Sequence, residues 1–137
     1  MFNLDELNRA SVGHLPGHLG IVLTHAASGG VWAELLIQPH LLAPNGYLHA
    51  GTLVSLADTA CGYGCMLSLP NGANGFTTLE LKSNHLSTAT SGLLVCHANI
   101  VHQGKTTQVW DAVVKHSETD KTLALFRCTQ MILYPKA

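Results

Sequence analysis

The sequence is poor in charge, since only 11% of its 137 residues are Asp, Glu, Lys or Arg, against roughly a quarter in an average soluble protein. Seven basic and eight acidic residues leave a net charge of −1 with the histidines neutral. That balance offers no attraction for a polyanion, so we expect no nucleic-acid partner. We also expect a chain with so little surface charge to cover part of its surface by self-association.

Long apolar runs are missing as well. No run reaches the roughly 18 residues that a membrane-spanning helix requires. The first six residues, Met1 to Glu6, are acidic and carry no cationic segment of the kind that opens a secretory signal. These features predict a cytoplasmic protein that makes no contact with a membrane.

The four cysteines contain no C-x-x-C pair. Cys61 and Cys65 are four residues apart, which places both on one face of a helix. A zinc pair is the alternative that this spacing leaves open, but buried thiols in a reducing compartment are the favoured interpretation. We therefore expect neither a metal nor a cofactor.

The pattern of apolar residues, which make up 47% of the chain, predicts a single domain spanning residues 1–137. Residues 3–12 have the pattern of a short amphipathic helix that Gly13, Pro16 and Gly17 terminate. Period-2 alternation predicts two strands joined by a hairpin at residues 28–30, and four longer strands in an antiparallel meander. The expected strands cover residues 19–27, 30–38, 76–88, 93–103, 106–117 and 121–134.

Residues 50–69 differ from the rest because apolar or small residues surround them on all sides, which is typical of a buried helix. Gly62 and Gly64 lower helix propensity there, so we expect another element to pack closely against them. The economical arrangement is an α+β hotdog fold, in which a curved antiparallel sheet of five to six strands wraps one long central helix. A helix packed flat on a sheet fits the same pattern.

Asp58 is the only formally charged residue between Glu34 and Glu80, and it lies near the middle of this apolar helix. A buried carboxylate is costly unless it has partners. A structural Asp bonded to Ser55 or Thr59 is one interpretation. The polar segment 45–51 at the start of the helix favours another, because free N–H groups at a helix N-terminus bind anions and oxyanions.

The distance between Asp58 and the start of its helix at Ala50 argues for a dimer. Ala50 and Asp58 are eight residues apart, which is roughly 12 Å along a helix axis. Water activated by Asp58 could not attack a carbonyl held at the Ala50 N–H of the same helix. Two antiparallel helices would bring Asp58 of one subunit to the helix start of the other, so we expect a twofold dimer with two shared sites.

Residues 44–60 resemble the signature of the PaaI-like hotdog thioesterases, which are related to the 4-hydroxybenzoyl-CoA thioesterases. The shared pattern is a Gly, a His and an acid, at Gly46, His49 and Asp58. Residues 78–86 and 102–106 resemble the next strand of the family and its H-x-G-K/R turn, and the likeness extends over residues 19–134. Two departures stand out. Ala50 replaces the first Gly of H-G-G, and Ala43 replaces an Asn or Gln, with Asn45 two residues later.

The resemblance implies an acyl-CoA thioesterase that hydrolyses an acyl- or aryl-CoA ester to the free acid and CoA, assembled as a dimer of dimers. Asp58 would act as general base or nucleophile, and the Ala50 N–H would form the oxyanion hole. His49 would orient the loop or the carbonyl, and Thr78 would hold Asp58 or the water. Asn45 is the candidate replacement for the missing amide. The residues expected to bind CoA or pantetheine are Gly51, His85, Leu86, Ser87, His102, Gly104, Lys105 and Thr106.

The acyl group itself is not specified, although Tyr63, Met66 and Phe76 are candidates for lining its pocket. Two rival functions fit the same residues. A hotdog enoyl-CoA hydratase or dehydratase would pair His49 with Asp58, and hydration of crotonyl-CoA would reveal it. A non-catalytic acyl-CoA-binding module would retain acyl-CoA tightly without hydrolysing it, but it would have no need for Asp58.

Overall fold

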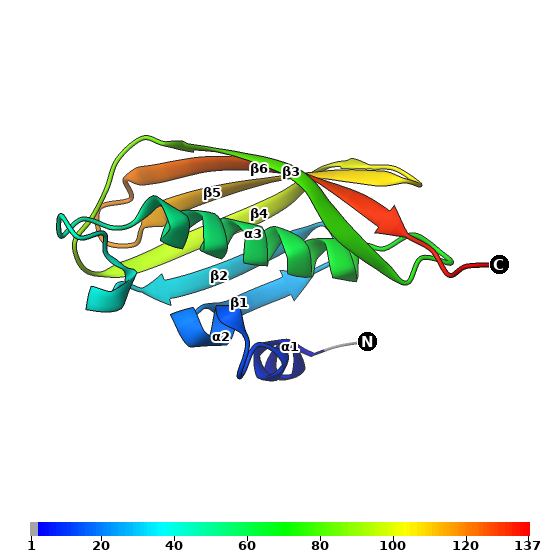
Figure 1. Ribbon diagram of the computed structural model, residues 1–137, viewed down its shortest axis with the longest axis horizontal. Coiled ribbons are helices and arrows are strands. Elements are labelled where there is room, and N and C mark those ends of the chain that lie inside the picture. The colour runs from blue at the N-terminus through cyan, green and yellow to red at the C-terminus, as the bar shows by residue number, and fades with distance from the viewer. Residues whose placement is uncertain (1–2) are drawn as a thin grey trace.

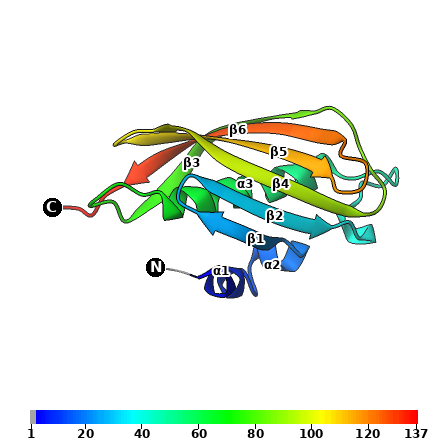
Figure 2. The same ribbon diagram turned by 180° about the vertical axis from the view of Figure 1, so that it is seen from behind.

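A six-stranded antiparallel sheet curves around one long helix in the computed structural model, which describes residues 3–137. The helices are α1 (Leu4–Ala10), α2 (Leu15–Leu19), the short 3-10 helix η1 (Pro39–Leu41) and α3 (Ala50–Leu67). The strands are β1 (Val22–Ala27), β2 (Gly30–Leu36), β3 (Gly75–His85), β4 (Leu93–Gln103), β5 (Thr107–His116) and β6 (Thr122–Leu133). In Figures 1 and 2, α3 lies along the inner side of the sheet, while α1 and α2 lie beside β1. This arrangement is the predicted hotdog fold.

The sheet order is β1-β2-β4-β5-β6-β3. The expectation of a simple meander for the last four strands is therefore wrong for β3, which pairs with β6 rather than with β4. The reason is that β2 already occupies the edge of β4, with Gly30 opposite Asn99 and Leu36 opposite Leu93. The chain from residue 86 to residue 92 consequently crosses the end of the sheet, and β3 becomes an outer strand (Figure 1).

The first helix is shorter than predicted, and a second helix follows it. Pro16 was expected to prevent helix formation, yet α2 begins at Leu15 with Pro16 in its first turn. The missing N–H of proline costs nothing there, because the first N–H groups of a helix have no partner within it. Strand β1 accordingly begins at Val22 rather than at residue 19.

One face of α3 packs on the sheet, and the other does not. The buried positions recur at helical spacing: Thr52, Leu53, Leu56, Ala57, Ala60, Cys61, Gly64 and Cys65. Gly64 lies so close to the buried Trp110 ring that an added Cβ would be 2.5 Å from it, whereas at Gly62 it would meet Phe76 at 3.4 Å. The expected close packing at these glycines thus occurs within the chain. The expectation of burial on all sides is wrong for the single chain, because the opposite stripe of α3 is only partly covered.

The C-terminal end of α3 is fixed by a set of hydrogen bonds at Ser68. The Ser68 carbonyl accepts from the side-chain amides of Gln103 at 3.0 Å and Gln108 at 2.8 Å. The Ser68 hydroxyl accepts from the Gly29 N–H at 2.9 Å. The turns of two hairpins are thereby tied to the last turn of the helix, whose carbonyls would otherwise lack partners.

Within residues 3–137, every helix is too short or too polar to cross a bilayer.

Candidate functional site

The start of α3 is shaped by His49, the residue that caps the helix. Its Nδ1 accepts a hydrogen bond from the Gly51 N–H at 2.7 Å. An imidazole nitrogen that accepts cannot carry a proton, so the ring is neutral and its hydrogen lies on Nε2. A Cβ on Gly51 would stand 2.9 Å from Nδ1, and glycine is therefore needed at this position. His49 is set up to donate from Nε2 while Nδ1 holds the helix terminus.

The Ala50 amide is the donor that this cap leaves available. The Thr52 N–H donates to the His49 carbonyl at 3.0 Å, and the Gly51 N–H is taken by the imidazole. Within residues 3–137, no acceptor for the Ala50 N–H is found. Ala50 is exposed and lies at the positive end of an 18-residue helix, where an oxyanion would be stabilised.

Asn45 lies in a narrow loop just before the helix. Its side-chain oxygen accepts from the Tyr47 N–H at 3.1 Å, and the Ala43 N–H donates to the Tyr47 carbonyl at 2.7 Å. The acceptor of Asn45 thus stabilises the turn. Its exposed amide group is the part that can still donate to a substrate.

Asp58 lies on the partly covered stripe of α3. Its Oδ1 is buried and lacks a hydrogen-bond partner within the described chain. Among the described residues, Ser83 Oγ is the other buried side-chain oxygen or nitrogen without a partner. Burial raises the pKa of the Asp58 carboxyl above its ordinary range, because desolvation disfavours the charged form. The interpretation of Asp58 as a structural residue bonded to Ser55 or Thr59 is wrong, since the Ser55 hydroxyl donates to the Gly51 carbonyl at 2.8 Å.

Asp58 opens into a groove of about 240 Å³. The residues that line it come from α3, from β3 and from α2: Asp58, Thr59, Gly62, Tyr63, Met66, Phe76, Thr78 and Pro16. The three candidates for an acyl pocket, Tyr63, Met66 and Phe76, thus share one groove with the carboxylate. None of the eight lining residues is basic. The groove therefore suits an uncharged group placed next to a carboxylate.

Thr78 lies in this groove but is bonded elsewhere. Its hydroxyl donates to Gln130 Oε1 at 2.7 Å, and Gln130 is fully buried. The hydroxyl hydrogen is therefore not available to Asp58, while the oxygen can still accept a hydrogen bond. Any part that Thr78 plays with water must use the oxygen as an acceptor.

The expected CoA-binding residues lie at opposite ends of α3. His85, Leu86 and Ser87 are at the N-terminal end, where the neighbouring Ala89 carbonyl accepts from the Leu48 N–H at 3.0 Å. His102, Gly104, Lys105 and Thr106 form the β4–β5 turn next to Ser68, at the C-terminal end. A helix of 18 residues is roughly 27 Å long. One chain therefore does not bring Lys105 to its own Ala50.

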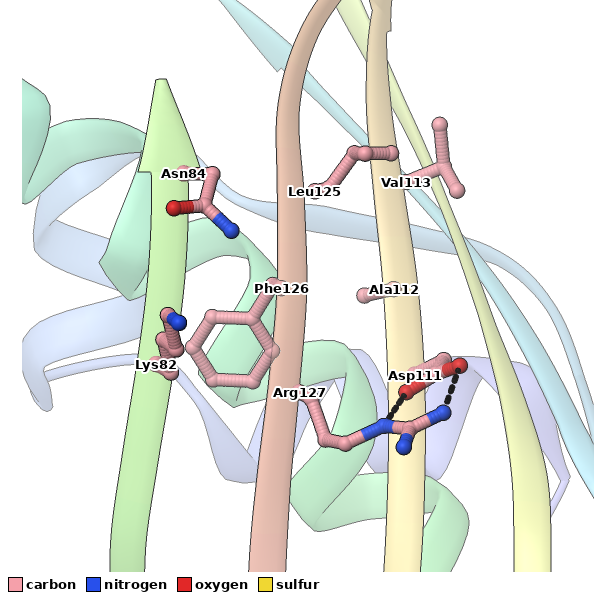
Figure 3. A pocket seen from close by; sticks show the side chains of 8 residues that line it. All are labelled: Lys82, Asn84, Asp111, Ala112, Val113, Leu125, Phe126 and Arg127. Carbon is pink, nitrogen blue, oxygen red and sulfur yellow. Dashed lines mark hydrogen bonds and ion pairs between the residues drawn. The ribbon is translucent and has the colours of Figure 1, made fainter. Parts of the chain in front are cut away.

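A second hollow, of about 320 Å³, lies over β3, β5 and β6 (Figure 3). Its charged side chains alternate with buried neighbours, so they face away from α3. Arg127 of β6 binds both oxygens of Asp111 of β5, at 2.5 and 2.8 Å, and Figure 3 shows this pair together with Lys82 on β3, across β6 from it. The hollow contains no candidate nucleophile or free carboxylate for hydrolysis.

All four cysteines are buried and unpaired. Burial raises the pKa of Cys65 and of Cys96 to about 12, so both stay protonated near neutral pH. The expected burial of Cys61 and Cys65 is confirmed. Among residues 3–137, no group of three or more His, Cys, Asp or Glu side chains is placed to hold a metal.

The sequence pattern missed three residues of the groove. Gly62 is four residues beyond Asp58, so helical spacing alone could have found it, whereas that spacing does not indicate Thr59, which directly follows Asp58. Pro16 lies 42 residues before Asp58 in the chain, and it reaches the groove only because α2 packs on α3. No local signal in the sequence indicates that contact.

A curved antiparallel sheet around a single helix, with a carboxylate halfway along that helix in an apolar groove, defines a protein of the hotdog fold with a candidate active site. Residues 45–123 match the family model of the thioesterase superfamily, and the chain belongs to that family. It is 35% identical over 111 residues to a 1,4-dihydroxy-2-naphthoyl-CoA hydrolase of Listeria monocytogenes, covering 81% of this chain and 89% of the relative. It is 31% identical to the proofreading thioesterase EntH of Klebsiella pneumoniae, covering 81% and 80%.

Solved structures that superpose on the chain are also thioesterases. A thioesterase of Haemophilus influenzae superposes with a TM-score of 0.90 at 27% identity, covering 98% of this chain and 92% of the other. A mutant thioesterase of Pseudomonas aeruginosa gives 0.91 at 26% identity, covering 98% and 96%. The protein is thus a hotdog-fold thioesterase, an enzyme that hydrolyses thioesters.

Proposed function

We propose that the protein hydrolyses an uncharged acyl- or aryl-CoA thioester, with Asp58 as the general base. The observation that carries this proposal is the Asp58 carboxyl group, which is desolvated and has an unpaired Oδ1 inside an apolar groove. Desolvation makes a carboxylate a stronger base, and an unpaired oxygen can accept a proton from water. The reaction class comes from the family, and the residue roles come from this geometry.

The chemistry follows from the two groups described. Asp58 takes a proton from water as the water oxygen attacks the thioester carbonyl. The Ala50 N–H, at the positive end of α3, stabilises the oxyanion that forms. The C–S bond then breaks, and the CoA thiolate receives from Asp58 the proton that Asp58 took from water, which leaves the free acid, CoA and a regenerated carboxylate. A covalent acyl-enzyme on Asp58, detected by mass spectrometry during turnover, would instead support direct attack by the carboxylate.

Ala50 and Asp58 of one helix are roughly 12 Å apart, which is too far for both to act on one thioester. In a homodimer, the Ala50 N–H of one subunit can lie close to Asp58 of the other. Strand β3 ends the sheet and pairs only with β6 within the described chain. It offers an 11-residue edge, and Leu79 and Leu81 on it are 52% and 41% exposed. A second copy pairing antiparallel along this edge would lay the two α3 helices side by side in opposite directions. The Ala50 N–H of one subunit would then face Asp58 of its partner.

The uncharged acyl group follows from the lining of the groove, which offers two aromatic rings and no basic side chain for a second carboxylate. The naphthoyl-CoA hydrolase relative supports starting an assay with aryl-CoA esters. Released CoA would be measured with a thiol reagent over aryl-, short- and medium-chain esters, and hydration of crotonyl-CoA would be followed in parallel. Hydration of crotonyl-CoA without release of CoA would replace the hydrolase proposal with a hydratase.

The shared site is tested with two variants that are each expected to be inactive, Asp58→Asn and Ala50→Pro. Proline suits the first position of a helix, and the extended backbone of His49 accommodates a following proline, so Ala50→Pro removes the N–H without breaking α3. Half of the dimers formed by co-expression would be mixed, and each would hold one intact site. Activity should therefore return to about a quarter of wild type. No recovery in purified mixed dimers would exclude a shared site.

A further inference from the structure

The first two helices form an appendage to the fold, the N-terminal arm, which comprises residues 3–20. It lies outside residues 45–123, which match the family model. Asn8 attaches the arm to β1 through two hydrogen bonds. Its Nδ2 donates to the Leu23 carbonyl at 2.9 Å, and its Oδ1 accepts from the Leu23 N–H at 2.8 Å. The arm is thus fixed to the edge of the sheet at one point.

Tyr63 attaches the arm to α3 at a second point. Its hydroxyl donates to the Leu7 carbonyl at 3.3 Å and lies 2.6 Å from the Ser11 hydroxyl. Because Tyr63 has one hydroxyl hydrogen and a carbonyl can only accept, Ser11 is the donor in the shorter bond. Ser11 is 5% exposed, so water is not a ready replacement partner. One side chain of the groove therefore holds the arm in place.

The groove has three sides that come from different parts of the chain. The partly covered stripe of α3 forms its floor, and Asp58, Gly62 and Met66 follow one another along it at four-residue spacing. Phe76 and Thr78 of β3 form one wall, with Phe76 next to Gly62. Pro16 of α2 also lines the groove, and α2 packs on α3. The position of the arm therefore sets the width of the groove beside the carboxylate.

We propose that the N-terminal arm is the specificity wall of the acyl groove, and that Tyr63 sets its position by bonding Ser11 and Leu7. The wall restricts the site to compact acyl groups, such as a single aromatic ring, and excludes bulkier ones. This inference rests on the proposed function, because it assigns the groove to the acyl group of the thioester. Asn8 and Ser11 are positioning residues in this scheme, since they act on the substrate only through the arm.

Two substitutions loosen the arm from different sides. Tyr63→Phe keeps the ring in the groove and removes both hydroxyl bonds, while Asn8→Ala releases the arm from β1 without touching the groove. Each variant would be assayed with benzoyl-CoA and biphenyl-4-carbonyl-CoA. The ratio of kcat/KM for the bulky ester to that for the compact ester should rise roughly fivefold to tenfold, the factor that one net hydrogen bond represents. In Asn8→Ala, kcat for benzoyl-CoA should stay within about twofold of wild type, since the arm makes no contact with the reacting atoms.

Ser28→Ala is the matched control, because the Ser28 hydroxyl also donates to a serine, Ser68 at 3.4 Å, which belongs to α3's C-terminal cap and not to the arm. Its ratio should equal that of wild type, whereas Ser11→Ala should shift the ratio in the same direction as Tyr63→Phe. A changed ratio in Tyr63→Phe alone would show that the hydroxyl acts on the substrate directly, and it would refute the proposal that the arm limits the acyl group. Unchanged ratios in all variants that hydrolyse benzoyl-CoA would also refute that proposal. If wild type hydrolyses neither CoA ester nor any other of the panel, the proposed function itself fails.

Discussion

Replacing Asp58 by Asn should abolish activity and stabilise the fold at the same time. The substitution keeps the shape of the side chain and removes its charge. Loss of a general base is expected to lower kcat by roughly 10²- to 10⁴-fold. The stability effect has the opposite sign, because the burial that raises the pKa of Asp58 also makes the folded state unfavourable for the carboxylate.

The size of the stability effect follows from the charge that the substitution removes, because the amide group of Asn would still lack a partner at this position. A buried polar group without a partner costs about 1–3 kcal/mol, and a charged one costs more. Since the rest of the carboxyl group faces an open groove, solvent screening limits the extra cost of the charge to about 1 kcal/mol. For a chain of this length, that corresponds to an increase in Tm of about 3–5 °C at neutral pH.

Thermal unfolding as a function of pH checks the sign. The folded state binds the Asp58 proton more tightly than the unfolded state, so wild type loses stability as pH rises from the ordinary aspartate pKa to the raised one. The Tm difference between Asp58→Asn and wild type should be near zero in acid, grow across that window and stay constant above it. A Tm below that of wild type at neutral pH would refute the burial argument, and normal turnover in a folded variant would remove Asp58 from the mechanism.

Three further substitutions or titrations test separate parts of the site. Hydrolysis should fall as pH drops through the raised pKa of Asp58, so the acidic limb of kcat/KM should lie above the range of an exposed aspartate; a limb at the ordinary value would contradict the desolvation of the carboxyl group. Lys105→Ala should raise KM for CoA esters far more than for pantetheine esters, since the exposed lysine would meet only the nucleotide; equal effects on both substrates would argue against that contact. Gly64→Ala should lower stability by about 1–3 kcal/mol in urea unfolding, because the new Cβ would meet the Trp110 ring at 2.5 Å, and a neutral result would mean that the ring moves freely.

The periodicity of the sequence predicted the six strands and the long central helix, but neither α2 nor the pairing of β3. The alternation at Thr107–His116 and the apolar stretch at Ala50–Leu67 correspond to β5 and α3. The position of β3 was not predictable in the same way, because neighbours in sequence pair by default, and only the competition from β2 for the edge of β4 displaces it.

In the candidate site, too, the residues were predictable from the sequence but their hydrogen bonds were not. Asp58 was predictable because a charge in an apolar helix is chemically conspicuous, and His49 and Ala50 because they stand at the start of that helix. The hydrogen bond from Gly51 to His49, which selects the imidazole tautomer, depends on a rotamer and is not encoded in any spacing. The bond from Thr78 to Gln130 joins residues 52 positions apart, so only the β3–β6 pairing explains it.

The hydrogen bonds at Ser68 give the central helix two unequal ends. The last turn is locked to the Gly29, Gln103 and Gln108 segments, whereas the first turn is held mainly by the short loop before it. Amide hydrogen exchange should consequently be slowest near Cys65 and become faster toward Ala50. Fluctuations of α3 would then be concentrated in its N-terminal turn, where the proposed oxyanion donor Ala50 lies, while its C-terminal turn stays fixed.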